Sequence, residues 1–242
     1  MARKGFKAAL LDVIMPRKRI LYAGIVLIAA FVAVFLLVYS KISYGFDVSV
    51  FHLINSTLSV QSLNSFFAAA AVYGREYFWV PVVALMWILG GVFKNEKAQK
   101  GALLLVIVFI IIIIVGLSLK AAYYRPRPFL TLSGVNVLVP KDLDSSFPSG
   151  HALVVAAGAA AAFFFLKKRY SIPLIIEAAV VSYSRVYVGV HYPTDVLAGV
   201  LLGAGIAMVV YYLLADREIF DRLFKYIQGI YNKIFRISRP SS

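Results

Sequence analysis

Long apolar runs separated by short polar segments make up most of the chain. Six runs approach the length of about 20 residues that an α-helix needs to cross the hydrocarbon core of a bilayer. None alternates apolar and polar residues as barrel strands do, and a backbone in lipid must satisfy its own hydrogen bonds, so helices are predicted. The predicted spans are 20–39, 77–93, 101–119, 149–166, 172–188 and 194–214. The second can extend back through 66–73.

Three other segments mix apolar and polar residues. Residues 1–19 and 216–242 are basic and repeat apolar side chains at helical spacing, which predicts amphipathic helices at the membrane interface. Residues 41–65 predict a helix that lies on the membrane surface or is partly inserted, rather than a span. The apolar face of the tail helix is predicted to hold Phe220, Leu223, Ile227, Ile230 and Ile234.

The predicted fold class is therefore all-α. The chain is expected to be a polytopic membrane protein, with a six-transmembrane-helix bundle and interfacial amphipathic helices. The pattern contains no repeat, linker or composition change that would divide it, so residues 1–242 are expected to form a single domain. Residues 1–19 are its N-terminal interfacial segment, and residues 216–242 are its amphipathic, basic C-terminal tail.

Composition and charge support the membrane assignment. The chain is 62% hydrophobic and 15% charged, whereas soluble domains average about 45–50% and about 25%. A formal net charge of +14 would suggest nucleic acid as a partner of a soluble protein. Here the basic residues lie mostly between apolar runs, where they set topology and contact anionic lipid headgroups. Nucleic acid is therefore not an expected partner.

The distribution of Lys and Arg predicts the orientation. With six spans both termini share one side, which carries six basic residues before the first span, three in each of two loops and six in the tail. These eighteen outnumber the seven on the other side, so the termini are expected in the cytoplasm of a plasma-membrane protein. The first run is longer than a signal-peptide core and is interpreted as a retained anchor. The absence of cysteine excludes disulfides and thiolate chemistry.

Three cations fall at the predicted outer ends of the spans: Lys120, Arg127 and Arg185. Charges at a membrane edge are costly, and convergence on a multiply charged anion would explain them, since Arg forks and Lys ammonium groups both bind phosphate oxygens. Ser149 and Gly150 lie where the fourth span should begin. Free N–H groups at a helix start bind anions, and glycine permits close approach.

Two histidines lie in the same clusters. His191 precedes Asp195 by four residues, with Pro193 between them at a favoured first helical position. A carboxylate on one ring nitrogen fixes the tautomer and makes the other nitrogen a better nucleophile. His151, in the first turn of the fourth span, could protonate a leaving oxygen while His191 attacks phosphorus. His52 is interpreted as an interfacial residue. Lys41, Arg75 and Lys141 are interpreted as anchors or loop charges, and Arg125 either assists or flanks the anion site.

These residues form the pattern Lys120-x6-Arg127-Pro128, Pro148-Ser149-Gly150-His151, and Ser184-Arg185-x5-His191-x3-Asp195. The pattern resembles the three-part signature of the type 2 phosphatidic acid phosphatase superfamily. The resemblance implies a helical bundle with its site at the span ends, and no metal or other cofactor. It implies that Lys120, Arg127, Ser149, Gly150 and Arg185 hold the phosphate. His191 would form a phosphohistidine, Asp195 would orient it, and His151 would be the general acid.

The sequence around the motifs, together with the basic tail, is similar to isoprenyl-diphosphate phosphatases of the bacitracin-resistance type. The expected partners are thus the bilayer and a membrane lipid phosphate. Phosphatidate or phosphatidylglycerol phosphate is the alternative substrate. The same pocket occurs in vanadate haloperoxidases, which are typically soluble. A non-catalytic lipid-phosphate binding or transport protein would need the cations but not the His–Asp pair.

Overall fold

The computed structural model describes residues 17–234, and within this range every regular element is helical. The α-helices are α2 (Arg17–Tyr39), α3 (Tyr44–His52), α4 (Asn64–Tyr73), α5 (Glu76–Val92), α6 (Glu96–Ala122), α7 (Pro128–Thr131), α8 (Gly150–Phe165), α9 (Lys168–Tyr187), α10 (Pro193–Leu214) and α11 (Glu218–Ile234). A π-helical turn, η1 (Leu53–Thr57), and a 3-10 turn, η2 (Gln61–Leu63), follow α3. The predicted all-α class is confirmed for the described part of the chain.

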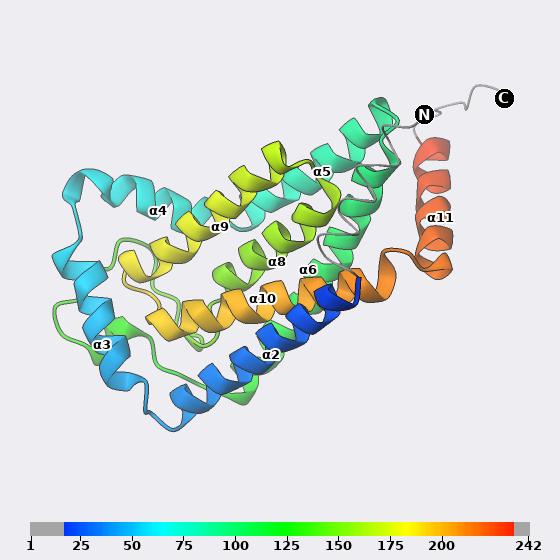
Figure 1. The fold of residues 1–242 in the computed structure, drawn as a ribbon. Coiled ribbons are helices and arrows are strands. Elements are labelled where there is room, and N and C mark those ends of the chain that lie inside the picture. The colour runs from blue at the N-terminus through cyan, green and yellow to red at the C-terminus, as the bar shows by residue number, and fades with distance from the viewer. Residues whose placement is uncertain (1–16, 235–242) are drawn as a thin grey trace.

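The long helices form an elongated bundle (Figure 1). Helix α8 is its centre and packs against α6, α9 and α10, while α2 packs along α10. Figure 1 also shows α3 and the loops before α8 at one end of the bundle, with α11 at the other. Segments far apart in the sequence therefore meet at the α3 end.

Close contact between α8 and α10 sets the position of the α8 N-terminus. A Cβ added to Gly199 would lie 2.6 Å from the carbonyl oxygen of Ser149, and one added to Gly203 would lie 2.2 Å from that of Leu153. Only glycine lets the two backbones come this close. The first turns of the two helices, which carry the Ser149 and Asp195 clusters, are thus held side by side.

Among residues 17–234, three helices are long and apolar enough to cross a membrane: α2, α6 and α10. Helices α4 and α5 pass the same test together with η2, but they meet at a bend of 59°. Helix α8 is apolar but has only 16 residues, and α9 is not among the helices that pass within the described range. Each predicted span coincides with a helix, but the count of six spans stays a prediction.

The predicted amphipathic tail is helical over Glu218–Ile234. Its contact with the bundle uses Phe220 and Phe224, which are almost fully buried, whereas Leu223 and Ile230 of the predicted apolar face are exposed. The N-terminal interfacial helix was predicted for residues 1–19, and residues 1–16 lie outside the described range, as do residues 235–242 of the tail.

Candidate active site

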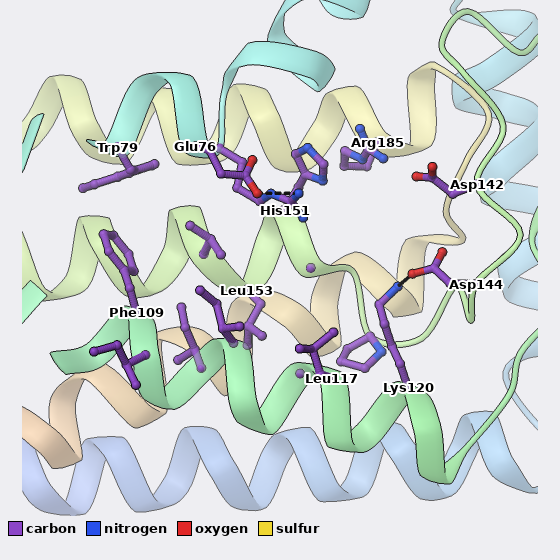
Figure 2. Close-up of a pocket in the computed structure, with 18 of the residues that line it drawn as sticks. Glu76, Trp79, Phe109, Leu117, Lys120, Asp142, Asp144, His151, Leu153 and Arg185 are labelled. Carbon is purple, nitrogen blue, oxygen red and sulfur yellow. Dashed lines mark hydrogen bonds and ion pairs between the residues drawn. The ribbon is translucent and has the colours of Figure 1, made fainter. Parts of the chain in front are cut away.

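A cavity of about 580 Å³ opens beside α5, α6 and α8 (Figure 2). One end is polar and is lined by Lys120, Arg127, His151, Arg185 and His191. The remaining wall is apolar, with side chains from α5 and α6 that include Trp79, Phe109 and Leu117. The cavity therefore suits a molecule with a charged head and an apolar tail.

Lys120 and Arg127 come together at the C-terminal end of α6 and the loop that follows it. Both cations contact Asp144: Lys120 Nζ lies 2.7 Å from Oδ2, and Arg127 Nη2 donates to Oδ1. Partial burial opposes ionisation of Asp144, but the hydrogen bonds from Lys120 and Arg127 lower its pKa to about 2. An ionised carboxylate thus contacts both cations of the first motif, and no motif in the sequence singled out Asp144.

Ser149 is the N-cap of α8, and Gly150 and His151 form its first turn. The Ser149 amide donates to the Asp195 carbonyl at 3.0 Å, which ties this turn to α10. The Ser149 hydroxyl is buried and has no hydrogen-bond partner. The start of a helix, with free N–H groups and an unpaired hydroxyl, is an anion-binding arrangement.

Arg185 is buried near the C-terminal end of α9. Its Nη1 donates to the carbonyl oxygen of Ala71 at 2.7 Å, while Nε has no partner. The bond to α4 fixes the guanidinium so that it lines the polar end of the cavity, on the side that Figure 2 shows opposite Lys120. Cations from α6, the following loop and α9 therefore surround one volume.

His191 lies in the short connection between α9 and α10 and is 1% exposed. Its Nδ1 is 3.5 Å from Asp195 Oδ2, and its Nε2 is 3.4 Å from Arg127 Nη1. The first distance is slightly long for a hydrogen bond, and such contacts often tighten when substrate binds. Burial, together with the charges of Arg185 and Arg127, lowers the pKa of His191 well below its usual value. A neutral ring therefore presents Nε2 to the cations.

Asp195 is fully buried, and two hydrogen-bond donors hold its carboxylate. The Tyr192 amide donates to Oδ2 at 2.8 Å, as expected where Pro193 begins the helix. Arg125 Nη1 lies 2.5 Å from Oδ1, and Arg125 Nη2 reaches Asp47 Oδ2 of α3 at 2.7 Å. The Arg125 guanidinium also lies 4.2 Å from the centre of the Tyr192 ring. The sequence left the role of Arg125 open. In the structure it joins two buried carboxylates behind the His191 ring.

The structure brings all eight predicted site residues to one end of the bundle, where Lys120, Arg127, Gly150, His151, Arg185 and His191 line the cavity. Ser149 and Asp195 support them from the neighbouring turns. His52 and Lys141 do not line the cavity, but Arg75, predicted to be an anchor or a loop charge, does. Within residues 17–234 no group of three or more His, Asp or Glu side chains is arranged to hold a metal ion.

A helical protein with cations, two histidines and a buried Asp around a cavity has the parts of a membrane phosphohydrolase. The sequence-family model of the PAP2 superfamily matches residues 100–219 of this chain. Undecaprenyl-diphosphatase from Sulfolobus acidocaldarius is 41% identical over 165 residues, covering 68% of this chain and 77% of the relative. The chain belongs to the PAP2 superfamily and is a membrane enzyme that hydrolyses phosphoric esters.

The chain is also similar to a second undecaprenyl-diphosphatase in sequence and to a solved phosphatase in structure. Undecaprenyl-diphosphatase BcrC from Bacillus subtilis is 31% identical, over 71% of this chain and 88% of the relative. The crystal structure of a transmembrane PAP2-type phosphatidylglycerolphosphate phosphatase from Bacillus subtilis superposes with a TM-score of 0.66 at 27% identity. That alignment covers 78% of this chain and 94% of the other. The family resemblance read from the sequence is thus confirmed.

Proposed function

We propose that the protein removes the terminal phosphate of an isoprenyl diphosphate held in the bilayer. The observation that carries this proposal is the continuous cavity, which joins the cationic end to an apolar wall on α5 and α6. A lipid placed there keeps its tail against side chains such as Trp79 and Phe109 while its phosphate reaches His191. The two relatives named undecaprenyl-diphosphatase support the isoprenyl class.

In the proposed reaction the neutral His191 attacks the terminal phosphorus through Nε2. The bond between phosphorus and the bridging oxygen breaks, and that oxygen takes a proton from His151. Lys120, Arg127 and Arg185, with Ser149 and the Gly150 turn, stabilise the charge on the remaining phosphoryl oxygens. Asp195 stabilises the imidazolium through Nδ1. The products of this step are an isoprenyl phosphate and a phosphohistidine.

Water completes the reaction. His151, now deprotonated, accepts a proton from a water molecule that attacks the phosphohistidine. The P–N bond breaks, inorganic phosphate leaves, and His191 returns to its neutral form. Each group thereby regains its starting protonation state, and no oxidant or reductant is required.

The substrate proposal is tested by measuring phosphate release from an isoprenyl diphosphate, phosphatidate and phosphatidylglycerol phosphate with the purified protein in detergent. We expect the isoprenyl diphosphate to give the highest kcat/KM. The structural similarity to a phosphatidylglycerolphosphate phosphatase makes that lipid the second candidate. A preference for it would contradict the isoprenyl proposal while leaving the phosphatase assignment intact.

Activity is expected to survive chelation and to be lost with vanadate. Three cations and a helix start take the place of a metal at the phosphoryl oxygens, and vanadate can mimic five-coordinate phosphorus. The measurement is phosphate release in EDTA, with and without added magnesium, and in a vanadate titration. Complete loss in EDTA that magnesium restores would contradict a metal-independent mechanism.

For the topology, we propose six spans, with α4 and α5 as one broken span and α8 and α9 completing the bundle. The site would then face outward, and α11 would lie on the cytoplasmic surface. The basic residues between α5 and α6, between α8 and α9, and along α11 support this orientation, because positively charged loops remain in the cytoplasm. Such a site would act on carrier lipid in the outer leaflet.

Cysteine labelling tests the orientation, because the natural chain contains no cysteine. Lys141→Cys, in the exposed loop before α8, should react with an impermeant thiol reagent in intact cells. Lys97→Cys, exposed near the start of α6, should react only after permeabilisation. The reverse pattern would overturn the proposed topology.

A further inference from the structure

Arg75 is a fourth cation of the cavity, and the three-part signature does not include it. It precedes α5 at the 59° bend between α4 and α5, which turns it toward the polar end. A Cβ added to Gly150 would lie 3.6 Å from Arg75 Nη1, so the guanidinium is next to the first turn of α8. Its Nε is buried without a hydrogen-bond partner. An Arg that only anchored the helix in lipid headgroups would not be placed here.

Arg75 lies between the two ends of the cavity. Glu76, Trp79, Val80 and Val83 continue from it along one face of α5 and line the cavity, with Trp79, Val80 and Val83 in its apolar wall. In Figure 2 Glu76 lies between Trp79 and His151 along this wall. Arg75 is therefore at the junction of the polar end and the apolar wall, beside the histidine assigned to the leaving oxygen.

Three of the four cations of the cavity form two groups that each pair with a carboxylate, whereas Arg185 donates to the Ala71 carbonyl oxygen. Lys120 and Arg127 pair with Asp144, and Arg75 Nη2 pairs with Glu76 Oε1 at 2.5 Å. Both carboxylates line the same cavity. The cavity thus has two separate cationic positions, and each already binds one anionic group. A diphosphate has two phosphates to fill these positions, whereas a monoester has only one.

We propose that Arg75 binds the inner phosphate of a diphosphate lipid and so sets a preference for diphosphates over monophosphates. This inference rests on the proposed function. With the terminal phosphorus at His191 and the bridging oxygen at His151, the substrate must continue toward the apolar wall. The inner phosphate then passes Arg75, whose planar fork binds two of its oxygens. Gly150 has no side chain to compete for the guanidinium.

The test compares an isoprenyl diphosphate with the monophosphate of the same chain length. The readout is the ratio of their kcat/KM values. Arg75→Ala should lower this ratio about 10- to 100-fold, as expected for a lost charge-assisted hydrogen bond. Arg75→Lys should recover part of it, because the charge remains and the fork does not. Glu76→Gln frees the guanidinium and should raise the ratio or lower KM for the diphosphate.

Lys141→Ala is the matched control, since it removes an outer cation that does not line the cavity, and its ratio should equal that of the wild type. Equal losses on both substrates in Arg75→Ala, or an unchanged ratio, would overturn the proposal. If Arg75→Ala does not fold, a ratio in Arg75→Lys equal to wild type would overturn it instead. Wild-type protein that releases no phosphate from the diphosphate would contradict the proposed function itself.

Discussion

Replacement of His191 by alanine is expected to abolish phosphate release, with a loss of about ten-thousand-fold or more in kcat, as for other nucleophiles that act within a catalytic unit. The ring is 1% exposed, and its Nε2 points toward Arg127 while Nδ1 faces Asp195. No other imidazole in the described range has this arrangement. Phosphate release is measured in detergent, and thermal unfolding shows whether the variant retains its fold.

The covalent step has its own readout. Rapid acid-free quenching with substrate labelled in the terminal phosphate should trap a labelled protein that loses its label in acid, and His191→Ala should trap none. His52→Ala is the control, since His52 lies on α3 outside the cavity and should leave labelling unchanged. Normal labelling or substantial turnover in His191→Ala would rule out this residue as the nucleophile.

Replacement of Arg125 by methionine is expected to destabilise the fold and to reduce activity strongly. Its side chain is 8% exposed and pairs with Asp47 and Asp195, which are fully buried. Removing one partner of a buried ion pair costs about 3–5 kcal/mol, because the remaining charge is left unpaired. Asp195 would also lose the donor that fixes Oδ1, so we expect a lower kcat with little change in KM.

A double-mutant design separates these two effects. Arg125→Met alone leaves Asp47 and Asp195 without their cation, whereas adding Asp47→Asn removes one of these two carboxylates. The loss of unfolding free energy in the double variant should therefore be smaller than the sum of the losses in the single variants. Its kcat should remain low, because Asp195 still lacks its partner. Arg222→Met is the control: Arg222 is 74% exposed in its ion pair with Glu218, and such pairs contribute about 0–1 kcal/mol. Wild-type stability and kcat in Arg125→Met would refute the assigned role.

Local patterns predicted much of this architecture. The apolar runs located α2, α6 and α10 to within a few residues, and Pro193 and Ser149 marked helix starts that the structure contains. The signature residues could be named because each motif is contiguous in sequence. Their convergence was expected from topology alone, since the motifs fall at the same ends of neighbouring spans.

Other features depend on contacts that a linear pattern does not contain. Arg125 and Asp47 are 78 positions apart. Arg125 lies within the first motif, but Asp47 lies in a segment without one, so the sequence does not indicate that they pair. Arg75 lines the cavity at the bend between α4 and α5, whereas the sequence predicted either one continuous span or a later start of the helix. Periodicity predicted the apolar face of the tail helix without Phe224, but Phe224 contacts Trp87 of α5. Tertiary packing therefore decides which side chains of α11 are buried.

The carboxylate of Asp144 has a consequence for the end of each catalytic cycle. Because it contacts Lys120 and Arg127, it competes with any inorganic phosphate that remains there. An attached competitor acts at a high effective concentration, so it displaces the product without needing a second molecule. We expect weak inhibition by inorganic phosphate, which would let the enzyme continue to turn over where phosphate is abundant.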